Sequence, residues 1–514
     1  MTESQAAVRR APEGATAPGS PHADSSRRRL GTLSIAFMII AASAPLTTLA
    51  GGVPTSFAVS ESLGVPAGYL LLAAILLVFA VGYAAMSRFV TNAGAFYAYI
   101  AQGLARWLGI GASLSALVAY NAMQIGIAAM FGFSISDWLS TRFGVQTPWW
   151  LWVLVGIAVV GVLGILRVDL SAKVLTVLVA GEFLAVLVTD IISFAVAPEG
   201  VNVEGLTPGA LFAPGLGAVL AFGVAAFMGF EQAAIYVEEA KEPEKTIPRA
   251  TYIAVIGAGL FYAFSSWALE IGVGNSQIVP QSQELGPGIV FAFLGEHAGP
   301  IITDLAQVLF ITSLFAALLA FHNAVARYFF SLGREGVLPR FLGSVRGEHQ
   351  APWAGSLAQS LIALVATIGF AVAGAGSDDP LYPVLTMFTW LVNTGAFGLV
   401  MLMGIVAAAV VGFFLRDHRG VGVFQRLIAP GISVITLATV FVLILMNWDM
   451  LLGQTESNAL TFLLPALVIV PGVLGAIWGL VLRSTKPEVY DKIGHNIVEA
   501  PELVEFDDPA IHHH

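Results

Sequence analysis

The chain of 514 residues contains no cysteine and little charge, since only 11% of its residues are charged. The absence of cysteine excludes disulfides, thiol chemistry and iron–sulfur clusters. The sequence has no glycine-rich loop of the Walker type and no clustered metal-ligand spacing, so we expect neither an ATP-driven engine nor a metal site. The net charge of -10 argues against nucleic acid as a partner, because such binding needs a basic face. We therefore expect no cofactor and no enzyme.

The chain is instead rich in apolar sequence. Hydrophobic residues make up 57% of it and the mean hydropathy is +0.83, values that no soluble domain of this size carries without aggregating. Apolar runs of about 20 residues recur between turn and charge signals, which predicts an all-α membrane protein with twelve spans. The predicted spans are 32–59, 66–87, 107–136, 149–166, 172–196, 212–237, 247–272, 301–331, 353–374, 381–413, 427–447 and 460–482.

Charge distribution predicts how the chain is oriented in the cell membrane. Residues 1–30 are polar and rich in Pro, Ser and Arg, which predicts a disordered tail and no cleavable signal peptide. Every Lys and Arg except Arg142 falls on a tail or on alternate loops. The positive-inside rule then places both termini in the cytoplasm. The second tail, 483–514, ends in His512, His513 and His514, which we interpret as a purification-tag remnant.

Two of the predicted spans contain helix-breaking residues. In the first span, Pro45 removes an amide donor and obstructs the preceding turn. In the sixth span, Gly229 weakens the helix two residues before Glu231. A carboxyl group at that depth costs several kcal/mol unless it faces a cavity, a partner or a pathway. Glu231 is therefore a functional candidate.

The positions of the two breaks predict an internal repeat. Interrupted segments at matching places in two halves indicate a transporter of inverted repeats, with its binding site between the breaks. We expect a first five-helix repeat at 31–196, a second at 212–413, and two added helices at 427–482. Because each repeat has an odd number of spans, the halves are antiparallel and the breaks meet near the midplane.

Several motifs in this order resemble the amino acid, polyamine and organocation (APC) superfamily of transporters. The most specific is Gly229-Phe230-Glu231 with the following loop Glu238-Glu239-Ala240-Lys241-Glu242-Pro243 and Thr246-Ile247-Pro248-Arg249-Ala250. Supporting matches are Thr91-Asn92-Ala93-Gly94-Ala95-Phe96-Tyr97-Ala98-Tyr99, Ala326-Arg327-Tyr328 and Gly333-Arg334-Glu335-Gly336-Val337-Leu338-Pro339. The chain is similar to actinobacterial-type amino acid permeases and to relatives of the putrescine importers.

The resemblance implies the LeuT-like fold and a secondary transporter that moves amino acids or related amines by alternating access. The family commonly has a Gly-Ser-Gly-Ile-Phe type break in span 1, whose free amides hold the substrate carboxylate. This chain has a different break, more similar to that of putrescine importers, in Ser43, Ala44, Pro45, Leu46 and Thr47. Pro45 has two interpretations. As the first residue of a half-helix, it leaves the Leu46 and Thr47 amides free to bind an anion. Alternatively, its missing N–H group removes a donor that a substrate carboxylate needs, which favours a substrate without a carboxylate.

The two deep carboxyl groups are the candidates for coupling. Glu231 either accepts a substrate ammonium or carries a proton once desolvated, unless it only caps a broken helix. Glu182 stands where several family members place a lysine that substitutes for sodium, and it either binds a cation, carries a proton or packs two helices. Since 314–321 contains no hydroxyl for sodium, we prefer proton coupling, in which His322 either relays protons or donates to a neighbouring carbonyl.

Other residues are predicted to line or close the pocket. Tyr120 and Gln124 share one helical face beside Asn121, where they contact substrate or join helices. Ala225 replaces the bulky tryptophan of the family's arginine exchangers and implies a roomier pocket. Aromatic candidates to close over a cation are Phe227, Phe321 and Trp390.

Charges elsewhere receive structural interpretations. We expect Asp190, Glu270 and Asp304 to be interfacial. The loop charges Glu238, Glu239, Lys241 and Arg249 form inner-gate ion pairs or stay solvated.

The sequence therefore predicts a membrane transporter that imports a small amine-bearing solute, an amino acid or polyamine, by proton symport. Its partners are protons and the lipid bilayer, and it is expected to be a monomer or weak homodimer. Within transport the alternative is an exchanger. A channel-like or sensor protein on the same fold is the alternative from another class, since fold does not fix function.

Overall fold

The computed structural model describes residues 31–90, 96–166, 172–231, 240–345, 351–454 and 456–494, and in these every element is a helix. Nine helical stretches of the described residues are long and apolar enough to cross a membrane, so the predicted multi-span helical protein is confirmed at this level. They correspond to α3 (Val65–Ser87), α5 (Arg106–Phe143), most of α7 (Ala172–Val196), most of α10 (Pro243–Val273), α13 (Pro300–Arg334), α14 (Trp353–Ala373), α15 (Thr389–Arg416), α16 (Ala429–Met446) and α18 (Ala459–Thr485).

The first, fourth and sixth predicted spans contain shorter helices. These are α1 (Thr32–Ala42), the π-helix η1 (Thr47–Gly52), α2 (Val53–Ser60), α6 (Trp149–Ile165) and α9 (Leu216–Phe227). The sixth predicted span is described only as far as Glu231. Residues 1–30 and the three terminal histidines lie outside the described residues.

Short helices also occupy segments between the predicted spans and in the second tail, where runs of three to ten residues are too brief for a helical period to be recognised. They are α4 (Phe96–Gly103), η2 (Glu204–Leu206), α8 (Pro208–Leu211), α11 (Ile278–Leu285), α12 (Gly288–His297), η4 (Arg340–Gly343), α17 (Trp448–Leu451) and α19 (Pro487–Lys492). Two further π-helices, η5 (Pro383–Phe388) and η6 (Phe424–Ile428), lead directly into α15 and α16.

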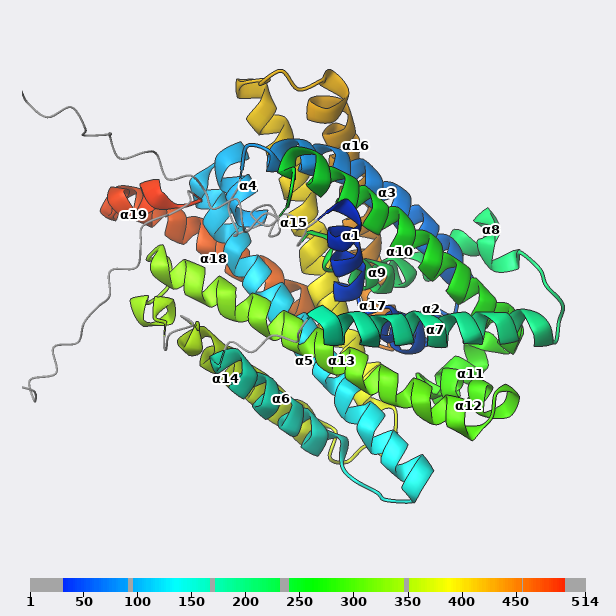
Figure 1. Cartoon of the computed structure of the whole chain (residues 1–514). Coiled ribbons are helices and arrows are strands. Elements are labelled where there is room, and N and C mark those ends of the chain that lie inside the picture. The colour runs from blue at the N-terminus through cyan, green and yellow to red at the C-terminus, as the bar shows by residue number, and fades with distance from the viewer. Residues whose placement is uncertain are drawn as a thin grey trace, which may run out of the picture.

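Helix α5 runs through the middle of the bundle and packs against α6, α13, α15 and α18 (Figure 1). Small residues allow the closest of these approaches: a Cβ atom on Gly475 of α18 would lie 3.0 Å from the Gly111 Cα of α5. Helices in a bilayer associate largely through such close packing. On another side of the bundle, α10 packs against α1, α3 and α7.

The outer helices turn large apolar side chains away from the protein. Val365 of α14 is 69% exposed and Phe462 of α18 is 70% exposed. Such surfaces are excluded from water in a stable monomer, and a lipid hydrocarbon phase accommodates them. The pattern agrees with a bundle embedded in a membrane.

The first predicted break is present between α1 and η1. Helix α1 ends at Ala42, Ala44 adopts the left-handed conformation with φ +46°, and Pro45 is the first residue of the next helical segment. A left-handed alanine costs about 1 kcal/mol or more, so the bend must be maintained by its surroundings. Pro45 occupies the position where a missing N–H group costs least.

The second predicted break follows α9. This helix ends at Phe227, Met228 is extended with ψ 137°, and Gly229 has φ +110°. Only glycine adopts that last conformation without strain. The chain therefore leaves the helical path directly before Glu231.

Candidate functional site

A cavity lies where the two breaks meet, with about 510 Å³ of space in and around it, including space open to the outside of the protein. The first break supplies Ser43, Ala44, Thr47 and Thr48, and the second supplies Ala225, Ala226 and Met228. The remaining lining residues come mainly from α5, α13 and the η5–α15 segment and are Gly52, Met123, Ile127, Phe222, Ala317, Phe321, Phe388 and Val392. The structure thus brings two segments about 180 residues apart to a single site.

Backbone groups at both breaks lie at this cavity. The half-helix that begins at Pro45 has the positive end of its dipole at the break. The last turn of α9 leaves carbonyl oxygens without intrahelical partners and provides a negative dipole end. The two breaks therefore provide opposite partial charges.

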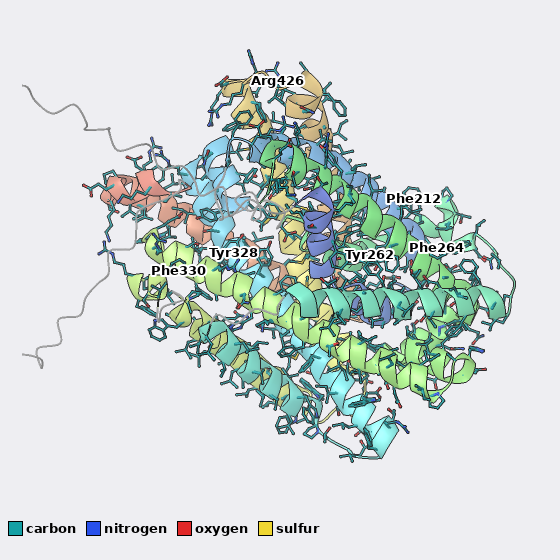
Figure 2. The ribbon with its side chains drawn as sticks, in the orientation of Figure 1. Phe212, Tyr262, Phe264, Tyr328, Phe330 and Arg426 are labelled. Carbon is teal, nitrogen blue, oxygen red and sulfur yellow. The ribbon has the colours of Figure 1, made fainter. Side chains whose placement is uncertain are left out.

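Ser43 is fixed by contacts to its own helix and to a neighbouring one. Its hydroxyl lies 2.7 Å from the Ile40 carbonyl oxygen and 2.7 Å from the Tyr262 hydroxyl. Tyr262 is on α10 and is labelled in Figure 2 beside α1. The Thr48 hydroxyl donates to the Ser43 carbonyl oxygen (3.3 Å) from the other side of the break.

Glu231 is 1% exposed, and both of its carboxyl oxygens accept hydrogen bonds. The Tyr120 hydroxyl of α5 donates to Oε1 (2.7 Å), and the Gly229 backbone amide donates to Oε2 (2.9 Å). The Tyr83 hydroxyl of α3 donates to the Glu231 carbonyl oxygen (2.9 Å). The residue thus holds the second break against α3 and α5, and it does not line the cavity.

Glu182, on α7, connects three separate elements. It is 2% exposed, and its Oε2 accepts hydrogen bonds from the Leu46 amide (3.3 Å) and the Ser313 hydroxyl (2.9 Å). Ser313 Oγ of α13 also lies 3.0 Å from Thr47 Oγ1. The carboxyl group therefore links α7 and α13 to the first break, and Thr47 faces the cavity.

These contacts correct two sequence interpretations. The Leu46 amide is not free for a substrate anion, because the protein's own Glu182 accepts its hydrogen. The eighth predicted span does contain a hydroxyl group near the first break. It belongs to Ser313, one residue before the segment 314–321, which contains none. Its signal in the sequence is a serine directly before that segment.

Neither deep carboxyl group has a cationic partner among the described residues. The ion pairs in this part of the chain join Arg106 to Asp491, Arg142 to Asp304, Lys245 to Glu242, His297 to Glu296 and Arg419 to Asp417. A buried carboxylate without a cation is costly in an apolar environment, so such a group favours a bound proton or a bound cation.

Of the three predicted residues on α5, only Tyr120 reaches a break. The Asn121 side chain donates to the Leu117 carbonyl oxygen of its own helix (2.7 Å). The Gln124 side chain accepts from Gln359 of α14 (2.6 Å). Residues four apart on a helix lie on only approximately the same face. Here Gln124 is bonded to α14, whereas Tyr120 is bonded to Glu231. Met123 and Ile127 line the cavity instead.

The predicted aromatic residues separate into different environments. Phe321 lines the cavity and its ring centroid lies 6.1 Å from that of Tyr120. Phe227 packs against Tyr69 and Tyr262 with centroids 6.4 and 6.0 Å away. Trp390 packs against the Phe370 ring at 6.1 Å and does not line the cavity. Ala225, as the resemblance suggested, lines it.

His322 faces away from the cavity. It is fully buried, its Nε2 lies 2.7 Å from the Ser356 hydroxyl of α14, and its ring packs on Gly164 of α6. The structure does not bring it to Glu182 or Glu231 in any hydrogen bond. Its Nδ1 is buried without a hydrogen-bond partner among the described residues, so the ring is hydrogen-bonded through one nitrogen at this helix interface.

The remaining predicted charges are placed as follows. Asp190 and Glu270 are buried inside the protein, and the Asp190 carboxyl group accepts a hydrogen bond from the Ser265 hydroxyl (2.7 Å). Asp304 is partly exposed and pairs with Arg142 (2.9 Å).

The predicted inner-gate ion pairs are not among the described contacts. Glu238 and Glu239 lie outside the described residues, and no ion pair among the described ones involves Lys241 or Arg249. The pair that this loop does form joins Lys245 to Glu242 (2.8 Å). The hydrogen bond and the positive charge of Lys245 lower the pKa of the Glu242 carboxyl group.

Comparison with known proteins places this geometry in a family. The low-affinity putrescine importer PlaP of Escherichia coli (strain K12) is 24% identical over 392 residues, which cover 74% of this chain and 80% of PlaP. The branched-chain amino acid permease BcaP of Lactococcus lactis subsp. cremoris is 25% identical over 351 residues, which cover 63% of this chain and 71% of BcaP.

A solved structure shares the fold. The manganese transporter of Eremococcus coleocola aligns with a TM-score of 0.50 and 15% identity, and the alignment covers 90% of this chain and 98% of that one. The sequence profile of amino acid permeases matches residues 30–474, which is most of the chain. The chain belongs to the amino acid permease family of the APC superfamily.

Proposed function

We propose that this protein imports a small amine-bearing solute, an amino acid or a polyamine, across the cell membrane by proton symport. Among its relatives, one is named a putrescine importer and another a branched-chain amino acid permease. The cavity at the two breaks is the proposed substrate site. Both termini are proposed to be cytoplasmic, from the distribution of Lys and Arg.

The proposed movement is alternating access on a LeuT-like arrangement of two five-helix inverted repeats, 31–196 and 212–413. Its support is the pair of breaks at Ala44 and Gly229, since the first supplies Ala44 and the second supplies Met228 to the lining of one cavity. Unwound backbone at the midplane of such transporters binds the polar groups of the substrate. Rocking of one group of helices against the other then exposes the site to each side in turn.

The proposed proton carrier is Glu182, and the observation that carries this proposal is its bridge between the first break and α13. As an ion, the carboxylate accepts hydrogen bonds from both Leu46 and Ser313. A bound proton occupies one oxygen, neutralises the group and weakens its charge-assisted hydrogen bonds. Protonation thereby loosens the contact between α7 and the break, which links proton binding to movement at the substrate cavity.

Glu231 is proposed to position the substrate site. Its two oxygens are already occupied by Tyr120 and by Gly229, so it fixes the shape of the second break. Substrate polar groups then bind the ends of the broken helices, where Ser43, Thr47 and the carbonyl groups of α9 meet the cavity. Both glutamates thus act on the breaks, with separate roles.

Uptake by proteoliposomes tests the proposal. A panel of labelled amino acids and polyamines is offered with an inward proton gradient, without one, and with unlabelled substrate preloaded. Proton symport predicts accumulation that depends on the gradient in empty vesicles. Uptake that ignores the gradient and requires preloaded substrate would instead establish exchange, and steady conductance without saturation would establish a channel.

A further inference from the structure

A second cavity, the outer cavity, lies at the end of α5 that is proposed to face the outside of the cell. Helix α5 supplies Phe133, Ser134 and Asp137 to its lining, α12 supplies Phe291, and α13 supplies Gln307. About 230 Å³ of space lies in and around it, including space open to the outside of the protein. Helix α12 packs against α13 at this end of the bundle (Figure 1). The outer cavity shares no lining residue with the cavity at the two breaks.

The outer cavity is in line with the cavity at the breaks. On α5, Ile127 lines the cavity at the breaks, and Ser134, about two turns further along, lines the outer one. On α13, Ala317 and Phe310 have the same relation. Gly51 of η1 packs on the Phe310 side chain, since a Cβ atom on it would lie 3.4 Å from that ring. A solute that moves along α5 and α13 toward the breaks therefore meets the outer cavity first.

Asp137 is a half-buried acid without a side-chain partner in the described part of the chain. Its carboxyl group takes part in none of the ion pairs there, and the Thr141 hydroxyl donates to its backbone oxygen (2.9 Å), not to its carboxyl group. Arg142, the nearest cation along the chain, is already paired with Asp304 (2.9 Å). A partly desolvated carboxylate beside open space attracts a cation from solution.

Three oxygen acceptors are available in the outer cavity. Besides the Asp137 carboxylate, they are the Ser134 hydroxyl and the side-chain carbonyl of Gln307. The Ser134 hydroxyl donates its own hydrogen to the Met130 carbonyl oxygen (2.7 Å), so its oxygen remains able to accept. A primary ammonium group has three N–H donors and no acceptor, and it therefore matches this set.

The rest of the lining is apolar and largely aromatic. Phe133, Phe291 and Phe310 contribute three phenyl rings, and the ring centroids of the last two are 5.5 Å apart. Phenyl rings attract an ammonium ion and pack against its alkyl chain. A metal ion fits less well, because the described residues contain no group of three or more His, Cys, Asp or Glu that could hold one.

We propose that the outer cavity is a second binding site, which binds the primary ammonium group of an alkylamine. Asp137 is its counter-ion, and Ser134 and Gln307 accept the remaining hydrogens. The inference rests on the proposed function only for the side of the membrane that this cavity faces. Binding itself does not require that the amine be transported.

A single introduced cysteine tests the site, because the chain has none of its own. Purified Ser134→Cys protein in detergent is treated with methanethiosulfonate reagents that carry either an ammonium or a sulfonate group. Each labelling rate is divided by the rate of the same reagent with free cysteine. We expect the ammonium reagent to be favoured by about tenfold or more, and butylammonium but not butanol to slow its reaction. Equal normalised rates, or labelling that butylammonium does not slow, would overturn the inference.

Two substitutions in the Ser134→Cys protein test the counter-ion. Asp137→Asn removes the charge from the cavity with little change in size, and Glu284→Gln removes an exposed charge from α11, which precedes α12. We expect Asp137→Asn to abolish both the preference for the ammonium reagent and the protection, and Glu284→Gln to retain both. Equal losses in the two variants would show a general surface potential in place of a site.

Gln307→Cys repeats the labelling from α13, and thermal unfolding shows which cysteine variants are folded. Butylammonium is also expected to raise the unfolding temperature of the wild-type protein but not of Asp137→Asn protein. A folded variant whose cysteine neither reagent labels would show that the cavity is closed to solutes, and the inference would be wrong. Protection without any uptake would contradict the proposed function alone, whereas uptake without protection would contradict this inference alone.

Discussion

At the scale of single residues, the proposed transport mechanism depends on the hydrogen bonds that two buried carboxyl groups accept. Glu231 receives hydrogen bonds from a tyrosine and a backbone amide, whereas Glu182 receives them from the first break and from α13. Burying such groups is tolerated only when their oxygens are paired. Each pairing partner is therefore open to a direct test.

The hydroxyl of Tyr120 is the first such partner. Tyr120→Phe leaves Glu231 Oε1 buried without its donor, so we expect a loss of about 1–3 kcal/mol in stability, measured by thermal unfolding in detergent. Tyr328→Phe is the matched control, because the Tyr328 hydroxyl is buried without a hydrogen-bond partner among the described residues. Equal effects of the two substitutions would contradict the role assigned to Tyr120.

Ser313 is the second partner. Ser313→Ala removes a donor from Glu182 and a contact to Thr47, so we expect weaker dependence of uptake on the proton gradient and a stability loss of about 1–3 kcal/mol. Thr312→Val is the control, since that hydroxyl donates only to the Leu309 carbonyl of its own helix (2.9 Å). Gradient dependence that falls equally in both variants would remove Ser313 from the coupling site.

At the scale of elements, the backbone of the two breaks determines where the helix ends lie. The φ of +110° at Gly229 turns the chain out of α9 and brings the Glu231 carboxyl group back to the Gly229 amide. At the first break, Ala44 adopts a left-handed conformation that Gly would adopt more easily. The π-helix that follows, η1, is a form that occurs frequently at functional sites.

A glycine substitution tests this geometry. Gly229→Ala places a Cβ atom at a backbone conformation that alanine rarely adopts, so we expect a stability loss of more than about 1 kcal/mol and impaired uptake. Gly257→Ala, in the regular helix α10 with only one atom at 3.7 Å, is expected to be neutral or stabilising by about 0.5–1 kcal/mol. Thermal unfolding and initial uptake rates are compared, and a neutral Gly229 variant would contradict the strain argument.

At the scale of the whole molecule, the proposed coupling predicts a separation of two activities. Glu182→Gln mimics the protonated state permanently, so we expect it to exchange labelled for unlabelled substrate but to lose accumulation driven by a proton gradient. With one proton per substrate, a gradient of one pH unit allows the wild-type protein about tenfold accumulation. Gradient-driven accumulation that survives in the Glu182→Gln protein would assign the proton to another group.

Much of the architecture was predictable because it follows local rules. Apolar runs long enough to cross a bilayer predict the spans. The breaks near Pro45 and at Gly229 follow from residue types that interrupt or weaken a helix. The depth of Glu231 was equally visible, because a charge inside an apolar run is conspicuous in sequence. The shorter helices α4, α11 and α12 were missed, since their periodicity is too brief to detect.

The site was predictable only in part. Ser43, Thr47, Ala225 and Phe321 line the cavity, whereas Gln124 and His322 hydrogen-bond to α14. Which face of a helix meets the cavity depends on helix rotation and on neighbouring helices, and no local pattern specifies either in a chain that is apolar on almost every face.

The sequence by itself determined that this chain is a helical membrane protein with two interrupted spans and two costly carboxyl groups, because bilayer thickness and helix-breaking chemistry act on neighbouring residues. Only the tertiary structure decided that Glu182 binds the Leu46 amide, that Ser313 joins them, and that the described lining of the cavity between the breaks contains no ionisable side chain. Those facts depend on contacts between segments more than a hundred residues apart. Such contacts are decided by the packing of the whole bundle.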